Sequence, residues 1–451
     1  MDEFTRLRIM LSGRDYRVLI AARFASQVAE GAFLASVVNT VVFSPESQST
    51  VRGFAVATVL TLLPFSLLEP IAGVFVDRYP RRPILVVLPL LRAGAGVLAL
   101  PGVAGIAAVY TGTLLVFSMN RLFTATAGAV VPRVVPEGDG AARGREEGRP
   151  EKPAGHAANG LLFTANMVAA VVGTVALFGG VLAGGLVAGA GGTGAVVVFC
   201  GAVWAATSLV AARLSTPLLP ERQRVDSLTG QLLETLSDLG DGFRRIGRTP
   251  AALAPILTVA AGQFLQVMVV AAALVVIKED LGGGLITFSG LVAAGGVGVF
   301  LGFVTAGAMR TRLPSPLLIG AAFVLAAVAL LPAAVVTLSA ATLTAGAVLL
   351  GASYGWTRVP VDTLAQQAVP DRYRGRVMTA IDLAFNTARV AAAVAAVGVV
   401  PWLGPQLTFV VLAVLFLLWA PVVPLWLRHA HVTCGPASGR RPAGRHPVAP
   451  R

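Results

Sequence analysis

Residues 251–277 read AALAPILTVAAGQFLQVMVVAAALVVI and contain no charged side chain. An α-helix rises about 1.5 Å per residue, so about 20 apolar residues cross the roughly 30 Å hydrocarbon layer of a bilayer. The run therefore predicts a membrane-spanning helix. Eleven similar runs are too long for barrel strands and lack their alternation, which leaves helices as the spanning element. The twelve predicted spans are residues 17–43, 52–76, 83–101, 105–131, 158–189, 194–213, 251–277, 285–308, 314–334, 340–361, 375–399 and 403–428.

The composition of the whole chain agrees with this reading. Of its 451 residues 56% are hydrophobic and 13% are charged, and the mean hydropathy is +0.79. These values exclude an ordinary soluble enzyme, a disordered scaffold and a small disulfide-stapled module. Cys200 and Cys434 offer no framework for disulfides or for a metal site. We therefore expect an all-α membrane protein with twelve transmembrane helices and without a bound metal.

The net charge of +13 is explained by topology. Of 35 Lys and Arg residues, 28 lie in the N-terminal segment, in every second loop and in the C-terminal tail. Under the positive-inside rule both termini are then cytoplasmic, and no nucleic-acid partner is needed to explain the charge. The first span is too long, with Arg23, Gln27 and Glu30 inside it, for a signal peptide, so we expect it to remain in the mature protein.

An internal repeat relates the two parts of the chain. An offset of 234 residues carries Gly73 onto Gly307 and Arg78 onto Arg312, and it carries residues 135–137 onto residues 369–371. Both parts begin on the cytoplasmic side, so they form two parallel repeats of six helices. In transporters of this architecture, the substrate is held near the membrane midplane between the two halves.

The segments outside the repeats predict the domain boundaries. Residues 1–213 form the N-terminal half and residues 251–428 the C-terminal half. The linker 214–250 carries apolar residues at helical spacing, which predicts an amphipathic helix on the inner membrane surface. The charged, Gly- and Pro-rich insertion 138–157 and the tail 429–451 are predicted to be disordered and cytoplasmic.

The segment Gly73-Val-Phe-Val-Asp77-Arg78-Tyr-Pro-Arg81-Arg82 resembles motif A of the major facilitator superfamily, which joins spans 2 and 3. A glycine lets two helices approach, an aspartate one turn later accepts charge-assisted hydrogen bonds, and the arginines pair with acidic groups or lipid phosphates. The resemblance implies a latch that shuts the cytoplasmic side, although the arginines could also be simple topology anchors. The latch residues are Gly73, Asp77, Arg78, Arg81 and Arg82, and a second copy without the aspartate consists of Gly307, Arg310 and Arg312.

A second motif narrows the resemblance. Residues 369–378, VPDRYRGRVM, resemble the loop between spans 10 and 11 in the macrolide-efflux and enterobactin-exporter branch, and the likeness extends over nearly the whole chain. It implies a proton-driven exporter of bulky organic compounds. We expect a monomer in the cell membrane that uses the proton gradient as its energy source and needs no cofactor. The loop residues that carry the resemblance are Asp371, Arg374, Gly375 and Arg376.

Charged residues inside the spans are the candidates for proton coupling, because an ionised group in the bilayer is costly unless it faces a cavity or a partner. Glu30 is the foremost candidate, with Arg23 seven residues earlier on the same face. Asp382 and Arg389 repeat that spacing in span 11, as a gate or a structural pair. Arg121 resembles the arginine of motif B, which is proposed to assist proton transfer. Static ion pairing and interhelical packing remain alternatives for all of them.

Polar and aromatic residues in apolar spans are candidates for the substrate cavity. Each could equally form an interhelical hydrogen bond or anchor at the membrane interface. An apolar cavity with few polar groups would suit a lipophilic small molecule. The candidates are Asn166, Gln263, Gln266, Tyr354, Trp356 and Asn386.

Other functions remain open at this stage. Import of a nutrient is possible because fold alone does not fix the direction of transport. A transport-inactive sensor on the same fold is a further alternative. A membrane enzyme would need histidines or paired carboxylates at the membrane surface, and all four histidines lie in the insertion or at the C-terminal end. We therefore expect that the protein is not an enzyme. The histidines are His156, His429, His431 and His446.

Overall fold

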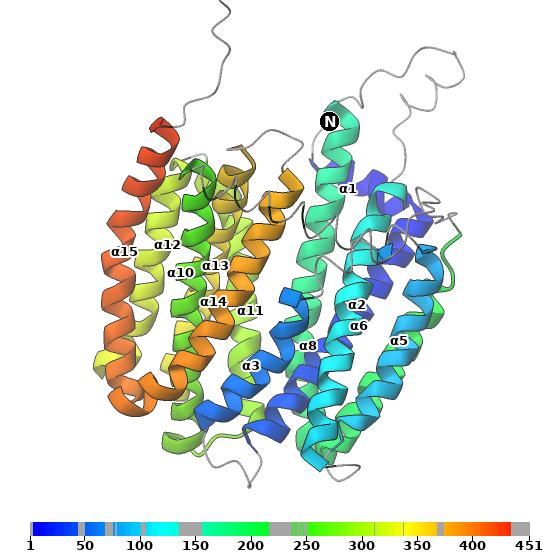
Figure 1. Cartoon of the computed structure of the whole chain (residues 1–451), viewed down its shortest axis with the longest axis horizontal. Coiled ribbons are helices and arrows are strands. Elements are labelled where there is room, and N and C mark those ends of the chain that lie inside the picture. Colours follow the sequence, from blue (N-terminus) through cyan, green and yellow to red (C-terminus); the bar gives the residue numbers. More distant parts are fainter. Residues whose placement is uncertain are drawn as a thin grey trace, which may run out of the picture.

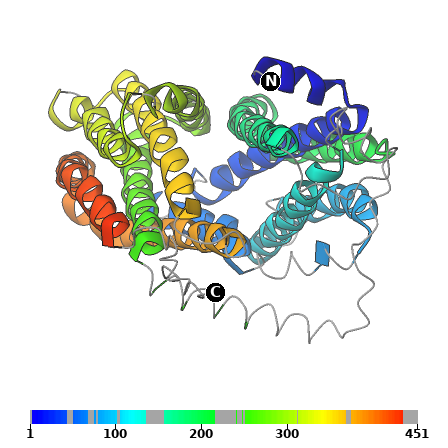
Figure 2. The same ribbon diagram turned by 90° about the horizontal axis from the view of Figure 1, so that it is seen from above.

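The computed structural model is helical throughout its regular structure, and the residues it describes contain no strand. It describes residues 3–43, 50–67, 75–76, 79–100, 105–134, 156–215, 237, 240, 244, 247, 250–310, 312–336, 338–367 and 374–433. The helices run roughly parallel to one another (Figure 1). Seen from above they form two groups (Figure 2).

The first group contains the helices of the N-terminal part. They are α1 (Glu3–Ser12), α2 (Arg14–Val41), α3 (Thr50–Leu67), α5 (Arg81–Leu98), α6 (Gly105–Val134) and α8 (His156–Ala211). The second group is built from α10 (Pro250–Val275), extended by the π-helical turn η1 (Val276–Asp280), α11 (Leu285–Arg310), α12 (Ser315–Leu331) with η2 (Pro332–Val336), α13 (Ala340–Gln367), α14 (Arg374–Leu403) and α15 (Pro405–Thr433).

Every predicted span falls on one of these helices, at least in part. Eight described segments are long and apolar enough to cross a membrane. The longest, Met167–Ala211 in α8, carries two predicted spans, and its helix breaks at Gly192, where φ is 72°. Helices α3, α5 and α13 are shorter or less apolar. An all-helical fold with helices long and apolar enough to cross a membrane is thus confirmed for the described residues, whereas the count of twelve spans stays a prediction.

The two groups repeat one arrangement. The offset of 234 carries the first residues of α3, α5 and α6, at positions 50, 81 and 105, to positions 284, 315 and 339, and α11, α12 and α13 begin at Leu285, Ser315 and Ala340. The packing repeats as well. Helix α2 packs on α8 as α10 packs on α14, and α3 packs on α6 as α11 packs on α13.

Small residues let helices within each group approach closely. A Cβ atom at Gly180 of α8 would collide with the backbone of Val28 on α2, and one at Gly298 of α11 would collide with the backbone of Val348 on α13. Membrane helices gain little from hydrophobic burial against one another, so close van der Waals packing of this kind stabilises their association.

The two groups touch where α2 ends and α3 begins, which we call the closed end. Lys278 of η1 donates a hydrogen bond of 2.6 Å from Nζ to the carbonyl of Val42, and Thr50 donates one of 2.9 Å to Oε1 of Glu279. Further along the same contact α8 meets α11, and α3 meets α14. In Figure 1 the closed end lies at the bottom, opposite the N-terminal helix and the end of α15.

The predicted non-spanning segments lie mostly outside the described residues. In the linker, residues 237, 240, 244 and 247 are helical and exposed, and its apolar positions are not described. At two boundaries the helices extend a few residues past the predicted limits. Helix α8 begins at His156, inside the predicted insertion, and α15 continues to Thr433, inside the predicted tail, because the apolar helices carry on into those residues.

Candidate functional site

A cavity of about 500 Å³ lies between the two groups of helices. Its wall is built from α2, α3, α8, α10, α11, α13 and α14, with contributions from α12, η2 and α15. Most lining residues are aliphatic or aromatic. The polar lining residues are threonines of α3, α8 and α13 together with Gln263, Gln266, Tyr354 and Arg389. A volume of this size accommodates a drug-sized organic molecule.

Some of the predicted cavity residues line the cavity and others do not. Gln263 and Gln266 of α10 line the cavity, and Nε2 of Gln263 donates a 2.8 Å hydrogen bond to Oε1 of Gln266. Trp356 instead donates from Nε1 to Thr305 of α11 at 2.8 Å and does not line the cavity. Asn386 is buried and also stays off the wall. The side chain of Asn166 lies outside the described residues.

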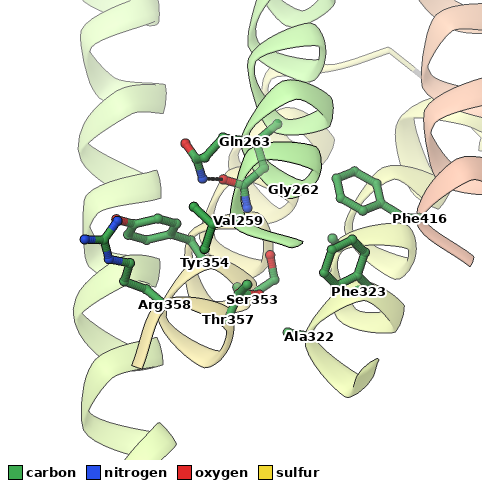
Figure 3. Close-up of a pocket in the computed structure, with 12 residues that line it drawn as sticks. Val259, Gly262, Gln263, Ala322, Phe323, Ser353, Tyr354, Thr357, Arg358 and Phe416 are labelled. Carbon is green, nitrogen blue, oxygen red and sulfur yellow. Dashed lines mark hydrogen bonds between the residues drawn. The ribbon is translucent and has the colours of Figure 1, made fainter. Parts of the chain in front are cut away.

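Behind this wall α10, α12, α13 and α15 enclose a hollow of about 10 Å³ (Figure 3). Gln263 lies above Tyr354, and Arg358 extends alongside the Tyr354 ring. The space is about that of one water molecule. Tyr354 lines both the hollow and the large cavity, so it connects the cavity to the charged residues of α13.

A buried charge cluster lies in the first group around Glu30, which is 5% exposed. Its Oε2 accepts a 2.7 Å hydrogen bond from Gln27 and lies 3.9 Å from Nη2 of Arg92, a fully buried residue of α5. Arg92 also donates to Ser26 at 2.8 Å, and its guanidinium carbon lies 4.7 Å from the ring centroid of Trp204. Asn120 of α6 also forms a side-chain hydrogen bond with Glu30, so four helices supply the partners of this carboxylate and its arginine.

Arg92, and not the expected Arg23, is the ion-pair partner of Glu30. Seven residues on one helix separate two side chains by about 10 Å along the axis, whereas a neighbouring helix can present an arginine side-on. Arg23 instead lies against α8, where a Cβ atom at Gly173 would be 3.4 Å from its Nε. That Nε is buried without a hydrogen-bond partner in the described part of the chain.

A second charge cluster lies in the other group around Arg358 of α13. Its Nε is 3.0 Å from Oδ2 of Asp362, and its Nη2 is 2.8 Å from Oδ1 of Asp382 on α14. The expected pair of Asp382 with Arg389 is not formed, for the same reason of axial distance. Arg121 of α6 interacts electrostatically with Asp382 from the first group, so this carboxylate faces arginines of both groups.

The predicted gating motifs are described only in part. Arg81 is 2% exposed at the start of α5, and Arg82 donates a 2.7 Å hydrogen bond to the carbonyl of Ala212. The second copy lies at and just beyond the end of α11, and its three residues are exposed: Gly307, Arg310 and Arg312. Gly73, Asp77, Arg78 and Asp371 lie outside the described residues, as do the side chains of Arg374 and Arg376 and the surroundings of Gly375 at the start of α14.

With this geometry in hand, comparison with known proteins decides the family. Residues 31–393, and again residues 256–450, match the family model of the Major Facilitator Superfamily. The chain belongs to the Major Facilitator Superfamily. It is therefore a membrane-embedded protein of a transporter family, and the predicted membership of the superfamily is confirmed.

Individual relatives add little beyond the superfamily. Two uncharacterized MFS-type transporters, of Mycobacterium bovis and Mycobacterium tuberculosis, are each 33% identical over 126 residues, which is 27% of this chain and 28% of either relative. The match thus spans little more than a quarter of the length of these curated relatives.

Solved structures show the same fold at low sequence identity. A peptide transporter of the POT family in complex with sulfate superimposes with a TM-score of 0.68 at 13% identity, covering 96% of this chain and 99% of that one. A bacterial homologue of the human lysosomal transporter Spinster, in an inward-facing and unoccupied conformation, gives a TM-score of 0.60 at 17% identity, covering 95% and 98%. These likenesses concern the fold alone.

Several site residues of this superfamily member were not among the sequence candidates. Arg92, Arg358 and Asp362 form the ion pairs of the two clusters. The available signal was an arginine inside an apolar run, which marks a residue that needs a partner. The spacing of charged residues along the sequence predicted ion pairs within one helix. Glu30, the partner of Arg92, instead lies on another helix. The described residues contain no group of three or more His, Cys, Asp or Glu side chains that could hold a metal ion.

Proposed function

We propose that this protein is a proton-coupled exporter of lipophilic small molecules that works by alternating access. We place it in the cell membrane as a monomer with twelve spans and both termini in the cytoplasm. The observation that carries the proposal is the cavity of about 500 Å³ between the two groups of helices, lined mainly by apolar side chains. Such a lining favours lipophilic over strongly hydrated substrates.

The contacts at the closed end suit one state of an alternating-access cycle. Lys278 bonds to the Val42 carbonyl and Thr50 bonds to Glu279, so polar contacts between described residues join the two groups there. With the termini in the cytoplasm, this end faces outward. Release of an exported substrate requires these contacts to break while the cytoplasmic end shuts, which is the role we assign to the latch around Arg81.

Glu30 is our candidate for the proton carrier. A carboxylate that is 5% exposed is stabilised by the Arg92 cation, and protonation removes that attraction. Proton binding therefore changes how tightly α2 is held to α5. Since α2 also supplies Leu34 and Val38 to the cavity wall, a change at Glu30 can reach the substrate through one rigid helix. The cluster is thus suited to link protonation to cavity shape.

Proteoliposome flux tests the proposal. The purified full chain is reconstituted, an acid-inside pH gradient is imposed, and uptake of a panel of labelled lipophilic compounds is followed. Molecules with the cytoplasmic face outward will accumulate substrate while protons leave the lumen. Glu30→Gln should lose gradient-driven accumulation while keeping exchange of substrate without a gradient. Asp280→Asn, which changes an exposed carboxylate of η1, is the matched control and should behave as the wild type.

Three outcomes would each contradict one part of the proposal. If no compound of the panel moves with the acid-inside gradient, proton-driven export is wrong. If Glu30→Gln accumulates substrate as the wild type does, Glu30 is not the coupling residue, although export stands. Uptake driven by the opposite gradient would indicate an importer.

A further inference from the structure

The described residues that line the cavity carry positive charge and no negative charge. Among the described residues that line it, Arg389 is the charged one, and no aspartate or glutamate contributes to the wall. The remaining polar groups are hydroxyls and amides, which accept either sign of ligand. A guanidinium on an otherwise apolar wall in the membrane interior is costly unless it meets a partner.

Arg389 has no ion pair within the described part of the chain, and the nearby carboxylates are engaged elsewhere. Asp362 and Asp382 both lie on Arg358, at 3.0 and 2.8 Å. Asp382 is also two helical turns away from Arg389 along α14, about 10 Å. Glu30 lies in the other group of helices with Arg92. The counter-ion that Arg389 lacks must therefore come from outside these clusters.

The aromatic ring of Phe385 fixes the arginine in this position. The guanidinium carbons of Arg358 and Arg389 each lie 5.4 Å from the Phe385 ring centroid, and both Phe385 and Arg389 line the cavity. Phe385 precedes Arg389 by one turn, so the ring covers the side chain on its own helix face. Arg358 is satisfied by its carboxylates, whereas Arg389 lines the cavity without a carboxylate partner in the described part of the chain.

We propose that the substrate is an organic anion, with an apolar body that fills the cavity and one carboxylate-like group that pairs with Arg389. The inference rests on the proposed function, since it names the substrate class of the same cavity. A planar guanidinium binds a carboxylate through two parallel hydrogen bonds, and an apolar wall strengthens that pair by excluding water. A neutral analogue leaves the cation unpaired, and a cationic one is repelled.

Equilibrium binding in the absence of a pH gradient tests this inference separately from transport. The full chain is placed in nanodiscs of neutral phosphatidylcholine and titrated with three tritiated probes of one shape: naphthylbutyrate, its primary amide and the corresponding amine. The carboxylate should bind about 10- to 100-fold more tightly than the amide, as expected for a charge-assisted hydrogen-bonded pair. The amine should bind most weakly.

Variants assign the effect to the arginine. Arg389→Gln should lose the 10- to 100-fold preference while binding the amide as the wild type does, which shows that the cavity is intact. Arg389→Lys should keep part of the preference, because it retains the charge without the planar fork. Arg213→Gln, at an exposed position beyond the end of α8, is the control and should change nothing.

The outcomes separate the inference from the proposed function. Equal affinity for the three probes, absence of carboxylate binding, or an unchanged preference in Arg389→Gln would overturn the anion site. Failure of proton-driven flux with the preference intact would overturn the proposed coupling and leave the anion site standing.

Discussion

The Glu30–Arg92 pair allows a quantitative prediction about stability. At 3.9 Å and an effective dielectric constant of about 20, the Coulomb attraction is about 332/(20 × 3.9), or about 4 kcal/mol. Replacing Arg92 with Met keeps the unbranched stem out to about the position of Nε and removes the cation. The carboxylate is then left buried, and we expect a loss of about 3–5 kcal/mol in the free energy of unfolding.

The remaining contacts of Arg92 set the bounds of this value. Its hydrogen bond to Ser26 and its position 4.7 Å from the Trp204 ring are lost together with the ion pair. These contacts contribute about 1–3 kcal/mol between them. Glu30→Gln removes the negative charge but leaves both, so its cost should be smaller than that of Arg92→Met. The double variant Glu30→Gln with Arg92→Met should be more stable than Arg92→Met alone.

Unfolding of the purified chain in mixed micelles with increasing SDS gives the measurement. The coupling energy of the double-mutant cycle should be about 2–4 kcal/mol, and Arg213→Gln should shift the midpoint by less than about 0.5 kcal/mol. A cycle in which the two single effects simply add would refute the reasoning, since it would mean that the two side chains do not stabilise each other. A fully stable Arg92→Met variant would refute it equally.

Three further predictions concern the closed end, the packing of α8 on α2, and Asp382. Thr50→Cys with Glu279→Cys, bridged by a short bis-thiosulfonate cross-linker, should hold the closed end together and stop substrate exchange, and reduction should restore the exchange. Unchanged exchange in the cross-linked protein would contradict alternating access at this end. Gly180→Leu should lower the free energy of unfolding by about 1–3 kcal/mol, because the α2 backbone leaves no room for a side chain there. The control is Gly179→Leu, which has no atom near its Cβ position and should stay close to the wild type in the same unfolding assay. Asp382→Asn should slow substrate exchange, because it removes the carboxylate that interacts with arginines of both groups. The free energy of unfolding should fall by about 1 kcal/mol, since the Asp382 side chain is 40% exposed. An unchanged exchange rate would exclude Asp382 from gating.

The helices could be predicted from the sequence because their signal is local. A run such as residues 251–277 is apolar over its whole length, and the bilayer leaves such a segment few conformations other than a helix. The break at Gly192 was likewise expected, as the gap between two runs. Boundaries failed where apolar and polar positions mix, as at His156 and Thr433.

The site was predicted less well. The sequence identified Glu30 and Asp382 as charged residues in need of partners, but it suggested Arg23 and Arg389 from the seven-residue spacing. The partners Arg92 and Arg358 lie on neighbouring helices. Of the predicted polar cavity residues, Gln263 and Gln266 line the wall, and Trp356 instead makes a hydrogen bond between helices.

The sequence by itself determined that this protein is a helical membrane protein with a repeated architecture, because hydrophobic length, charge bias and the offset of 234 residues are properties of the chain alone. Only the tertiary structure decided which charges neutralise each other and which side chain is left facing the cavity. Ion pairing depends on distances of a few ångströms across helix interfaces, and packing sets these distances without any fixed spacing along the chain. For this reason Arg389 appears as half of a pair in the sequence, whereas in the fold it lies on the cavity wall without an ion pair among the described residues.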